Sequence, residues 1–317
     1  MKKTVYVIVA CVATTLAVFL GGCATTTVQK GNAADAQAAD TQSYDERLAE
    51  CKKQIEAKTD FKPQVVIVLG TGLGDFVNSL DVKQTIPYKD INGWPESTAP
   101  EHAGNLVFAE YNGVKLAVMQ GRLHSYEGYS EQEVVLPLRV LHLLGADTVI
   151  LSNASGSLNP DFKVGEFVCV EDQISSFVSS PLIGKNNDEL GKRFVPMTDA
   201  FDKDLRNTVL KVGEQNGIPV HSGVYIQVPG PQFETPAEIR MYRSLGADTI
   251  AMSMADEVLA ARHMGMRVCA INCISNMAAG MEEGGFSDDN INEVMKGVSK
   301  NFETLAHGLL ETLGREK

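Results

Sequence analysis

Segment 121–129, GRLHSYEGY, concentrates side chains that can do acid–base and anion chemistry, and it follows an apolar run. Arg122, His124 and Tyr126 occupy every second position, with Glu127 beside them. In an extended chain these three alternating side chains point to one face. A forked cation, a titratable donor and a hydroxyl suit an oxyanion carried by a sugar. An exposed loop with solvated charges accounts for the segment equally well, so other parts of the chain must decide.

Two further segments bring glycine and small polar residues to the ends of apolar runs. GTGLG at 70–74 follows the β-branched run 65–69, and NASGS at 153–157 follows the run 148–151. Glycines between a strand and a helix let backbone N–H groups turn toward an anion. The first segment is G-x-G-x-G rather than the dinucleotide-binding G-x-G-x-x-G, and a plain tight turn explains it as well. We expect both segments to be loops.

The elements that position these segments alternate between strand and helix patterns. Strands are expected at 65–69, 105–110, 114–119, 148–151, 167–170, 223–228, 249–252 and 268–274. Helices are expected at 44–55, 75–80, 131–144, 203–216, 236–245, 256–263 and 290–313. This alternation predicts an α/β fold with its site at the strand ends. No internal repeat or linker divides residues 44–317, which we expect to form a single domain.

Composition narrows the function classes. The 317 residues are 44% hydrophobic and 21% charged, as in ordinary globular proteins. The formal net charge of −12 argues against nucleic acid as the main partner, because binding to phosphate backbones needs a basic surface. Any anion site must therefore be built from local donors.

The N-terminus has the pattern of a bacterial lipoprotein signal. Lys2 and Lys3 precede an apolar run at 5–20, and Gly21-Gly22-Cys23 follows. The run is short for a membrane span, so residues 1–22 are expected to be a cleaved signal peptide and Cys23 its lipidation site, although an uncleaved signal anchor is the alternative. Residues 23–43 are then a flexible tether. We expect a lipid-anchored protein of the bacterial cell envelope, outside the cytoplasm.

The remaining cysteines do not predict a disulfide or a metal site. Cys269 and Cys273 lie four residues apart in a strand-like run, which separates them by roughly 13 Å, too far for a bridge. No histidine follows at zinc-ligand spacing. Both are expected to be small buried hydrophobic residues.

Seven motifs in order resemble the trimeric purine nucleoside phosphorylases, and the match covers nearly all of residues 44–315. The motifs are LGTGLG at 69–74, HAG at 102–104, GRLHSYEGY at 121–129, NASG at 153–156, GPQFET at 230–235, AMS at 251–253 and ISN at 274–276. The resemblance implies a distorted mixed central β-sheet surrounded by helices, and a homotrimer. It implies phosphorolysis of inosine- or guanosine-type nucleosides to free purine and α-D-ribose 1-phosphate, with phosphate as co-substrate and no metal or organic cofactor.

The resemblance also implies site residues. The phosphate ligands would be Thr71, Arg122, His124, the Ala154 amide and Ser253, with His102 close by. Tyr126 and Met252 would contact the ribose, Phe233 would pack on the purine, and Phe177 would be lent across the trimer interface. Glu234 and Asn276 would read the purine edge, and with His124 they form the implied catalytic set. An amide donor from Asn276 to N7 stabilises the leaving base most in the transition state.

Simpler roles exist for four of these residues taken singly. Glu234 could cap the helix that begins near residue 236, Phe233 could be a core aromatic, Asn276 could cap a turn, and Ser253 could be a helix N-cap. None of these roles predicts the joint pattern.

Two departures from the family leave the ribose end open. The family carries a histidine near the start of the last helix, where this chain has Ile291 or Asn290, and His307 lies too far along to replace it. Segment 254–257, MADE, is more acidic and apolar than the family's run. The alternatives are a methylthioadenosine or adenosine phosphorylase and a catalytically silent nucleoside-binding lipoprotein.

Overall fold

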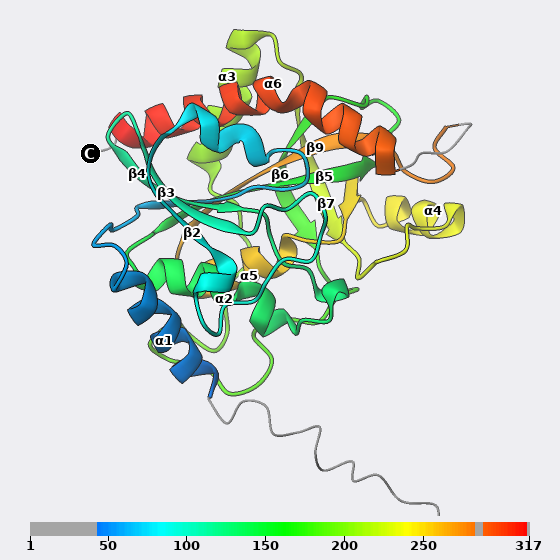
Figure 1. The fold of residues 1–317 in the computed structure, drawn as a ribbon. Helices are drawn as coiled ribbons and strands as arrows, with labels where there is room; N and C mark the ends of the chain where they lie inside the picture. Colours follow the sequence, from blue (N-terminus) through cyan, green and yellow to red (C-terminus); the bar gives the residue numbers. More distant parts are fainter. Residues whose placement is uncertain (1–42, 283–287, 316–317) are drawn as a thin grey trace, which may run out of the picture. The chain divides into compact units, whose positions relative to one another are not determined.

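A mixed β-sheet forms the centre of the molecule (Figure 1). The computed structural model describes residues 43–282 and 288–315. Within these ranges the strands are β1 (Val65–Val68), β2 (Asp81–Pro87), β3 (Asn105–Tyr111), β4 (Val114–Gln120), β5 (Thr148–Ser157), β6 (Phe167–Ile174), β7 (Val220–Gln227), β8 (Thr249–Ala251) and β9 (Arg267–Met277). Their order in the sheet is β2-β3-β4-β1-β5-β8-β7-β6-β9, and β9 also pairs with β5.

The extra pairing of β9 with β5 closes half of the sheet on itself. β5, β8, β7, β6 and β9 form a ring in which every strand has two neighbours, while β1, β4, β3 and β2 extend it as an open wing. β1 runs parallel to both β4 and β5, and its four residues are all buried, as expected for a strand covered on both faces. The expected distorted mixed sheet is therefore confirmed.

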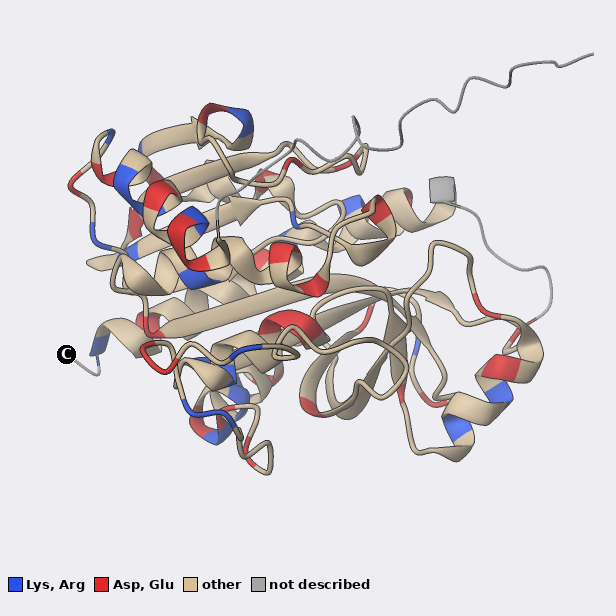
Figure 2. Cartoon of the chain, turned by 90° about the horizontal axis from the view of Figure 1, so that it is seen from below, with Lys and Arg blue, Asp and Glu red and all other residues tan. Residues whose placement is uncertain are grey.

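Helices cover the two faces of the sheet and form with it the two largest of the hydrophobic clusters among the described residues. The helices are α1 (Tyr44–Glu56), α2 (Glu131–Leu143), α3 (Lys203–Asn216), α4 (Pro236–Ser244), α5 (Ala255–His263) and α6 (Asp288–Arg315), with 3₁₀ turns η1 (Gly74–Ser79), η2 (Tyr88–Asp90) and η3 (Ser125–Glu127). α1, α2 and α5 pack against one face, and η1, α3 and α6 pack against the other (Figure 1). In Figure 2, acidic residues alternate with basic ones along the outer helices.

Local sequence signals fix where the helices begin. Ser43, Ser130 and Thr235 each accept a hydrogen bond from the third residue of the helix that follows, and a glutamate there bonds back, forming capping boxes. Asp202 caps α3, which ends at Gly217 in the left-handed conformation. These signals explain why the helix starts lie within one or two residues of the positions expected from sequence.

Three expectations from sequence differ from the structure. β2 was not expected, because most of its side chains are exposed and its pattern does not alternate. Segment 153–157 is not a loop: β5 continues to Ser157, where it pairs with β8 and β9. Segment 75–80 forms a 3₁₀ turn rather than an α-helix.

The N-terminal predictions fall outside the described residues. The signal peptide at 1–22, the lipidation of Cys23 and the tether at 23–43 involve almost only residues that the structure does not describe. Residues 42–317 form one compact unit. Among the described residues, no helix is long and apolar enough to cross a membrane.

Candidate active site

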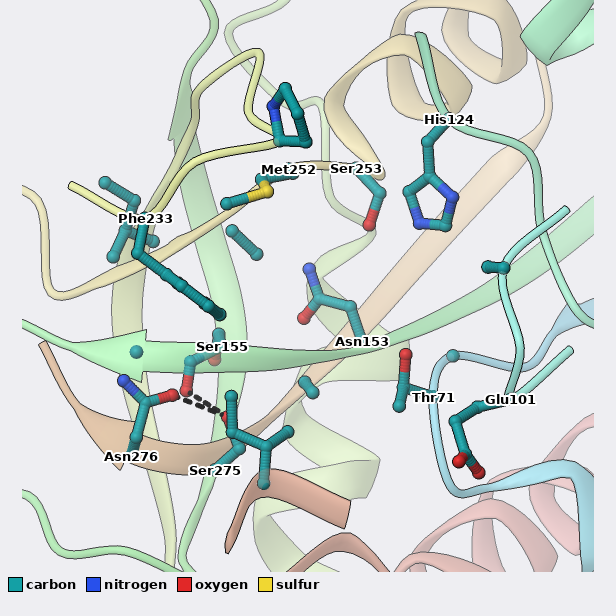
Figure 3. A pocket seen from close by; sticks show the side chains of 18 of the residues that line it. Thr71, Glu101, His124, Asn153, Ser155, Phe233, Met252, Ser253, Ser275 and Asn276 are labelled. Atoms are coloured by element: carbon teal, nitrogen blue, oxygen red, sulfur yellow. Dashed lines mark hydrogen bonds between the residues drawn. The ribbon is translucent and has the colours of Figure 1, made fainter. Parts of the chain in front are cut away.

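A cavity of about 440 Å³ opens where the ends of β1, β4, β5, β8 and β9 converge (Figure 3). Its volume lies within the range of small-molecule sites. The loop before α4 and the first turns of α6 complete its walls. Ten of the predicted site residues line it: Thr71, Arg122, His124, Tyr126, Ala154, Phe233, Glu234, Met252, Ser253 and Asn276. Two predicted residues, His102 and Phe177, do not.

One end of the cavity gathers groups that can donate to an anion. Thr71 follows β1, Ala154 lies in β5, and Ser253 follows β8. Gly70 lets the end of β1 approach β5, because a Cβ at this position would lie 2.7 Å from the Asn153 Cα. Two hydroxyl-bearing residues and Ala154 of β5 therefore line this end of the cavity from three different strands.

His124 forms a buried dyad with Glu127. The His124 Nδ1 lies 2.9 Å from the Glu127 Oε1, and the Thr98 N–H and hydroxyl donate to the other carboxylate oxygen at 2.5 and 2.6 Å. Burial raises the pKa of Glu127, but the hydrogen bonds from His124 and Thr98 outweigh it and lower that pKa to about 2. The ionised carboxylate can only accept, so the proton of neutral His124 is on Nδ1 and Nε2 is the ring's acceptor. Burial lowers the His124 pKa, which keeps the ring neutral at pH 7.

His102 supports this ring from behind. It stacks on His124 with centroids 5.3 Å apart, and its Nδ1 accepts from the Arg122 N–H at 3.2 Å. Burial lowers its pKa to about 4. Gly121 makes room for it, since a Cβ there would lie 2.7 Å from the His102 Cβ. His102 was predicted to lie close to the phosphate ligands. It contacts His124 and Arg122 from behind, but it does not line the cavity itself.

Arg122 lies in the cavity floor, where much of its hydrogen-bonding capacity is already used. Its side chain is 1% exposed, Nη1 donates to the Ser152 carbonyl, and Nη2 donates to Glu257 at 2.8 Å. The sequence predicted a forked cation facing an anion, and the structure adds that two nitrogens of the Arg122 fork are already bonded within the protein. Glu257 belongs to the acidic segment 254–257, and its carboxylate neutralises the buried guanidinium.

Ser253 is held in place through the backbone on either side. The Tyr225 hydroxyl donates to its carbonyl, and Met254 has φ +90°, a conformation that L side chains rarely adopt. Met254 is the N-cap residue of α5, so Ser253 is not the helix cap considered from sequence. The turn instead fixes the Ser253 side chain at the edge of the cavity.

The other end of the cavity carries an oriented carboxamide. Ser275 donates to the Asn276 Oδ1 at 2.8 Å (Figure 3). The Asn276 Nδ2 donates to the Met277 carbonyl at 3.1 Å. One Nδ2 hydrogen and one Oδ1 lone pair remain for a ligand. Asn276 lies within β9 and does not cap a turn. Gly156 leaves room beside it, since a Cβ there would lie 3.2 Å from the Asn276 Nδ2.

Glu234 and Phe233 form the wall next to Asn276. Thr235 and Glu238 cap α4, so Glu234 is not needed as its cap and faces the cavity. Burial raises the Glu234 pKa above that of an ordinary carboxyl. Phe233 is 45% exposed and is therefore not a core aromatic. A half-open aromatic plane beside an amide and a carboxylate suits a flat heterocycle with polar edges.

Sequence reasoning missed three groups that line or support the cavity. Glu101 accepts from the Asn292 Nδ2 at 3.3 Å, which joins the loop before β3 to α6 at the wall that also contains Ile291. The buried amide of Asn153 is the third group. No motif in the sequence points to Glu101 or Asn292 as site residues. Asn153 belongs to the NASG motif at 153–156, but only its neighbour Ala154 was assigned a role there.

Comparisons with known proteins agree with this geometry. Residues 64–311 match the model of the phosphorylase superfamily. Purine nucleoside phosphorylase 1 of Bacillus subtilis is 39% identical over 265 residues, which are 84% of this chain and 98% of that protein. The purine nucleoside phosphorylase of Bos taurus is 44% identical over 71% of this chain and 79% of its own length.

Solved structures show the same fold. The purine nucleoside phosphorylase of Schistosoma mansoni in complex with adenosine superposes with a TM-score of 0.80 at 35% identity, covering 84% of this chain and 97% of that one. A Schistosoma enzyme in complex with guanosine gives a TM-score of 0.78 at the same identity.

The chain therefore belongs to the phosphorylase superfamily. Within it, the relatives and the cavity define a purine nucleoside phosphorylase, which cleaves purine nucleosides with phosphate to the free base and ribose 1-phosphate. Phosphate is the co-substrate and the reaction requires no cofactor. The alternative of a catalytically silent binding protein is set aside.

Proposed function

We propose that the enzyme prefers 6-oxopurine nucleosides, inosine and guanosine, and that the cavity binds them with the base between Phe233, Glu234 and Asn276. The observation that supports this preference is the fixed orientation of the Asn276 amide by Ser275 and Met277. An amide can donate to N7 and accept or donate at the 6-position, while an ionised Glu234 accepts from the N1–H and from the guanine 2-amino group.

The same groups assist departure of the base. Phosphate attacks C1′ while the C1′–N9 bond breaks, and the electron pair of that bond remains on the purine, which takes up a proton. The negative charge that develops on the base strengthens the hydrogen bond from Asn276 to N7. This contact therefore stabilises the transition state more than the bound substrate.

Phosphate binds at the Thr71, Ala154, Ser253 and His124 end. Because Glu127 holds the His124 proton on Nδ1, Nε2 accepts the acidic proton of a bound phosphate monoanion, which becomes the dianion. The transfer leaves a more highly charged, more nucleophilic phosphate beside an imidazolium that Glu127 stabilises. Arg122, already paired with Glu257, contributes its remaining N–H capacity at the floor.

A second substrate class has specific support. The resemblance places Ile291 or Asn290 where the family carries a histidine at the nucleoside 5′ end, and Ile291 lines the cavity with Glu101 and Asn292. An apolar residue there favours nucleosides whose 5′ position lacks a hydroxyl. The Schistosoma enzyme crystallised with adenosine is a relative that binds a 6-aminopurine.

The test is to incubate residues 43–317 with inosine, guanosine, adenosine and 5′-methylthioadenosine, with and without phosphate, and to follow base release. We expect phosphate-dependent release from inosine and guanosine and little from adenosine. Asn276→Asp should shift the preference toward adenosine. Faster cleavage of methylthioadenosine than of inosine would instead establish the second class.

We also propose that Cys23 is acylated and that the enzyme is a lipid-anchored trimer of the bacterial cell envelope. The support is the basic and apolar sequence that ends in Gly21-Gly22-Cys23, together with the resemblance to trimeric relatives. Two or more acyl chains anchor a protein stably, and phosphorolysis outside the cytoplasm needs no ATP.

A further inference from the structure

Asn153 is a buried polar residue whose side chain has no partner in the protein. It is 3% exposed, and neither its Oδ1 nor its Nδ2 makes a hydrogen bond within the part of the chain that the structure describes. The side chain lines the cavity, with Ser253, Thr71 and His124 around it (Figure 3). Buried amides are nearly always satisfied, so a doubly unpaired one in a binding cavity indicates a ligand contact.

The backbone holds this amide in a fixed place. Asn153 lies in β5, where it pairs with Asn272 of β9, and the end of β1 packs directly on its Cα because Gly70 has no Cβ. The two strands that flank β5 here therefore leave its backbone no room to shift. An amide held this rigidly is pre-organised for a ligand.

Asn153 lies among residues assigned to both substrates. Thr71 and Ser253, which are assigned to phosphate, line the same cavity, and Ala154, whose N–H is also assigned to phosphate, is the next residue along β5. Tyr126 and Met252, which are assigned to ribose, line this cavity as well, and the Tyr126 ring stacks on His124 with centroids 4.5 Å apart. Phosphate requires donors and a sugar hydroxyl requires an acceptor, and a carboxamide supplies both from one planar group.

We propose that Asn153 bridges the two substrates, with Nδ2 donating to phosphate and Oδ1 accepting from a ribose hydroxyl. This role rests on the proposed placement of phosphate and ribose in the cavity. The bridge holds the attacking oxygen in a fixed relation to the sugar, which lowers the entropic part of the barrier. Asn153 then touches both substrates and is a catalytic residue in its own right.

The first measurement is calorimetric titration of the enzyme with inorganic phosphate alone, without nucleoside. Asn153→Ala should weaken phosphate binding about 10-fold, the loss of one hydrogen bond to a charged group, and Asn153→Asp should weaken it further because it places an anion beside an anion. The near-isosteric Asn153→Asp preserves volume, and its thermal denaturation shows whether the variant is folded. The control is Asn216→Ala, at an exposed asparagine on α3.

The second measurement compares kcat/KM on inosine, 2′-deoxyinosine and 3′-deoxyinosine. The loss caused by Asn153→Ala should be about 10-fold smaller on the analogue that lacks the bridged hydroxyl, as in a double-mutant cycle. Equal losses on all three nucleosides, or phosphate affinity within threefold of wild type in folded Asn153→Ala, would overturn the bridge. If wild-type enzyme released no base from inosine, the proposed function would fail, whereas the phosphate titration would still test Asn153.

Discussion

At the scale of single residues, the described residues that line the cavity include no lysine, and their one arginine is already paired. The Arg122 guanidinium is paired with Glu257, and both His102 and His124 have lowered pKa values because they are buried. Recognition must then come from hydrogen-bond donors at fixed positions and from a proton that moves with the ligand. Such a site discriminates by geometry and protonation state rather than by net charge.

The His124–Glu127 dyad leads to a prediction about phosphate. Glu127→Gln replaces the carboxylate that holds the proton on Nδ1 and stabilises the imidazolium with a neutral amide, so we expect KM for phosphate to rise by about 10-fold or more. KM for inosine at saturating phosphate should change little. Steady-state kinetics with both substrates varied checks this split. A parallel rise in both constants would mean that Glu127 only supports the loop, and Thr98→Ala should have a smaller effect than Glu127→Gln.

The purine edge gives a prediction with a pH signature. Glu234→Ala should lower kcat/KM for guanosine about 100-fold, if a transition-state hydrogen bond to a charged group is worth about 3 kcal/mol. Burial raises the Glu234 pKa, and the protonated carboxyl is neutral and keeps only one carbonyl acceptor, so it cannot accept from both the N1–H and the 2-amino group. In the wild type, kcat/KM should therefore fall on acidification at a pH above the ordinary glutamate range. The same limb in the profile of Glu234→Gln would assign it to another group.

At the scale of elements, the sequence predicted the helices well because their signals are local. The capping boxes at Ser43, Ser130 and Thr235 are readable from residue types three apart. β2 could not be predicted, since its exposed polar residues are paired with β3 only in the tertiary structure. The extension of β5 to Ser157 depends on β8 and β9, which lie about a hundred residues away.

The site could also be predicted only in part, because only some of its residues belong to local sequence motifs. Motifs identified the residues that face the ligand, and ten of these line the cavity. The groups that orient them come from other elements, as Glu257 of α5 does for Arg122 and Tyr225 of β7 does for Ser253. These partners come together only in the folded protein, and no regular spacing in the sequence relates them.

The start of α5 contains a buried carboxyl group, and its contribution to the free energy of unfolding depends on pH. Asp256 accepts from the Gln227 Nε2 at 2.8 Å, its Oδ1 has no partner among the described residues, and burial raises its pKa from 3.8 to about 7. The folded state therefore binds the proton more tightly than the unfolded state. Its stabilising contribution is complete below about pH 4 and is lost as the pH rises through 7.

Asp256→Asn removes this pH dependence and should stabilise the protein at alkaline pH. The difference between 3.8 and about 7 corresponds to about 4 kcal/mol at most. We expect Tm to exceed that of wild type at pH 8 and the gain to shrink toward pH 5, as measured by thermal denaturation at both values. The exposed Asp161→Asn is the matched control. A gain of the same size at both pH values would show that Asp256 is ionised throughout.

At the scale of the whole molecule, the cavity has an open side next to Phe233, which is 45% exposed. Phe177, 39% exposed and packed edge-on against Tyr242 at 5.1 Å, does not reach the cavity of its own chain. In the proposed trimer it closes the cavity of a neighbouring subunit. Phe177→Ala should then lower kcat/KM for inosine several-fold while the mass of the assembly is unchanged.

Mixed trimers test whether Phe177 acts on the cavity of a neighbouring subunit or on the cavity of its own subunit. Subunits with Phe177→Ala keep an intact cavity, and subunits with Glu234→Ala keep an intact Phe177. Co-refolded mixtures should regain activity above the average of the two parents, because some intact cavities then face an intact Phe177. Activity equal to that average at every ratio would contradict exchange between subunits.

The last prediction concerns where the molecule works. With Cys23 acylated, an enzyme whose described residues include no membrane-spanning helix would be held at a membrane by lipid alone. Cys23→Ala should release the protein into the soluble fraction or leave an unprocessed precursor, whereas residues 43–317 should keep full activity because the cavity uses no residue before Gly70. Ala24 in place of aspartate favours the outer membrane in a two-membrane cell. Labelling with a palmitate analogue, followed by fractionation, measures both outcomes. Wild-type protein that stays unlabelled and soluble with Met1 intact would refute the anchor while leaving the enzyme's chemistry untouched.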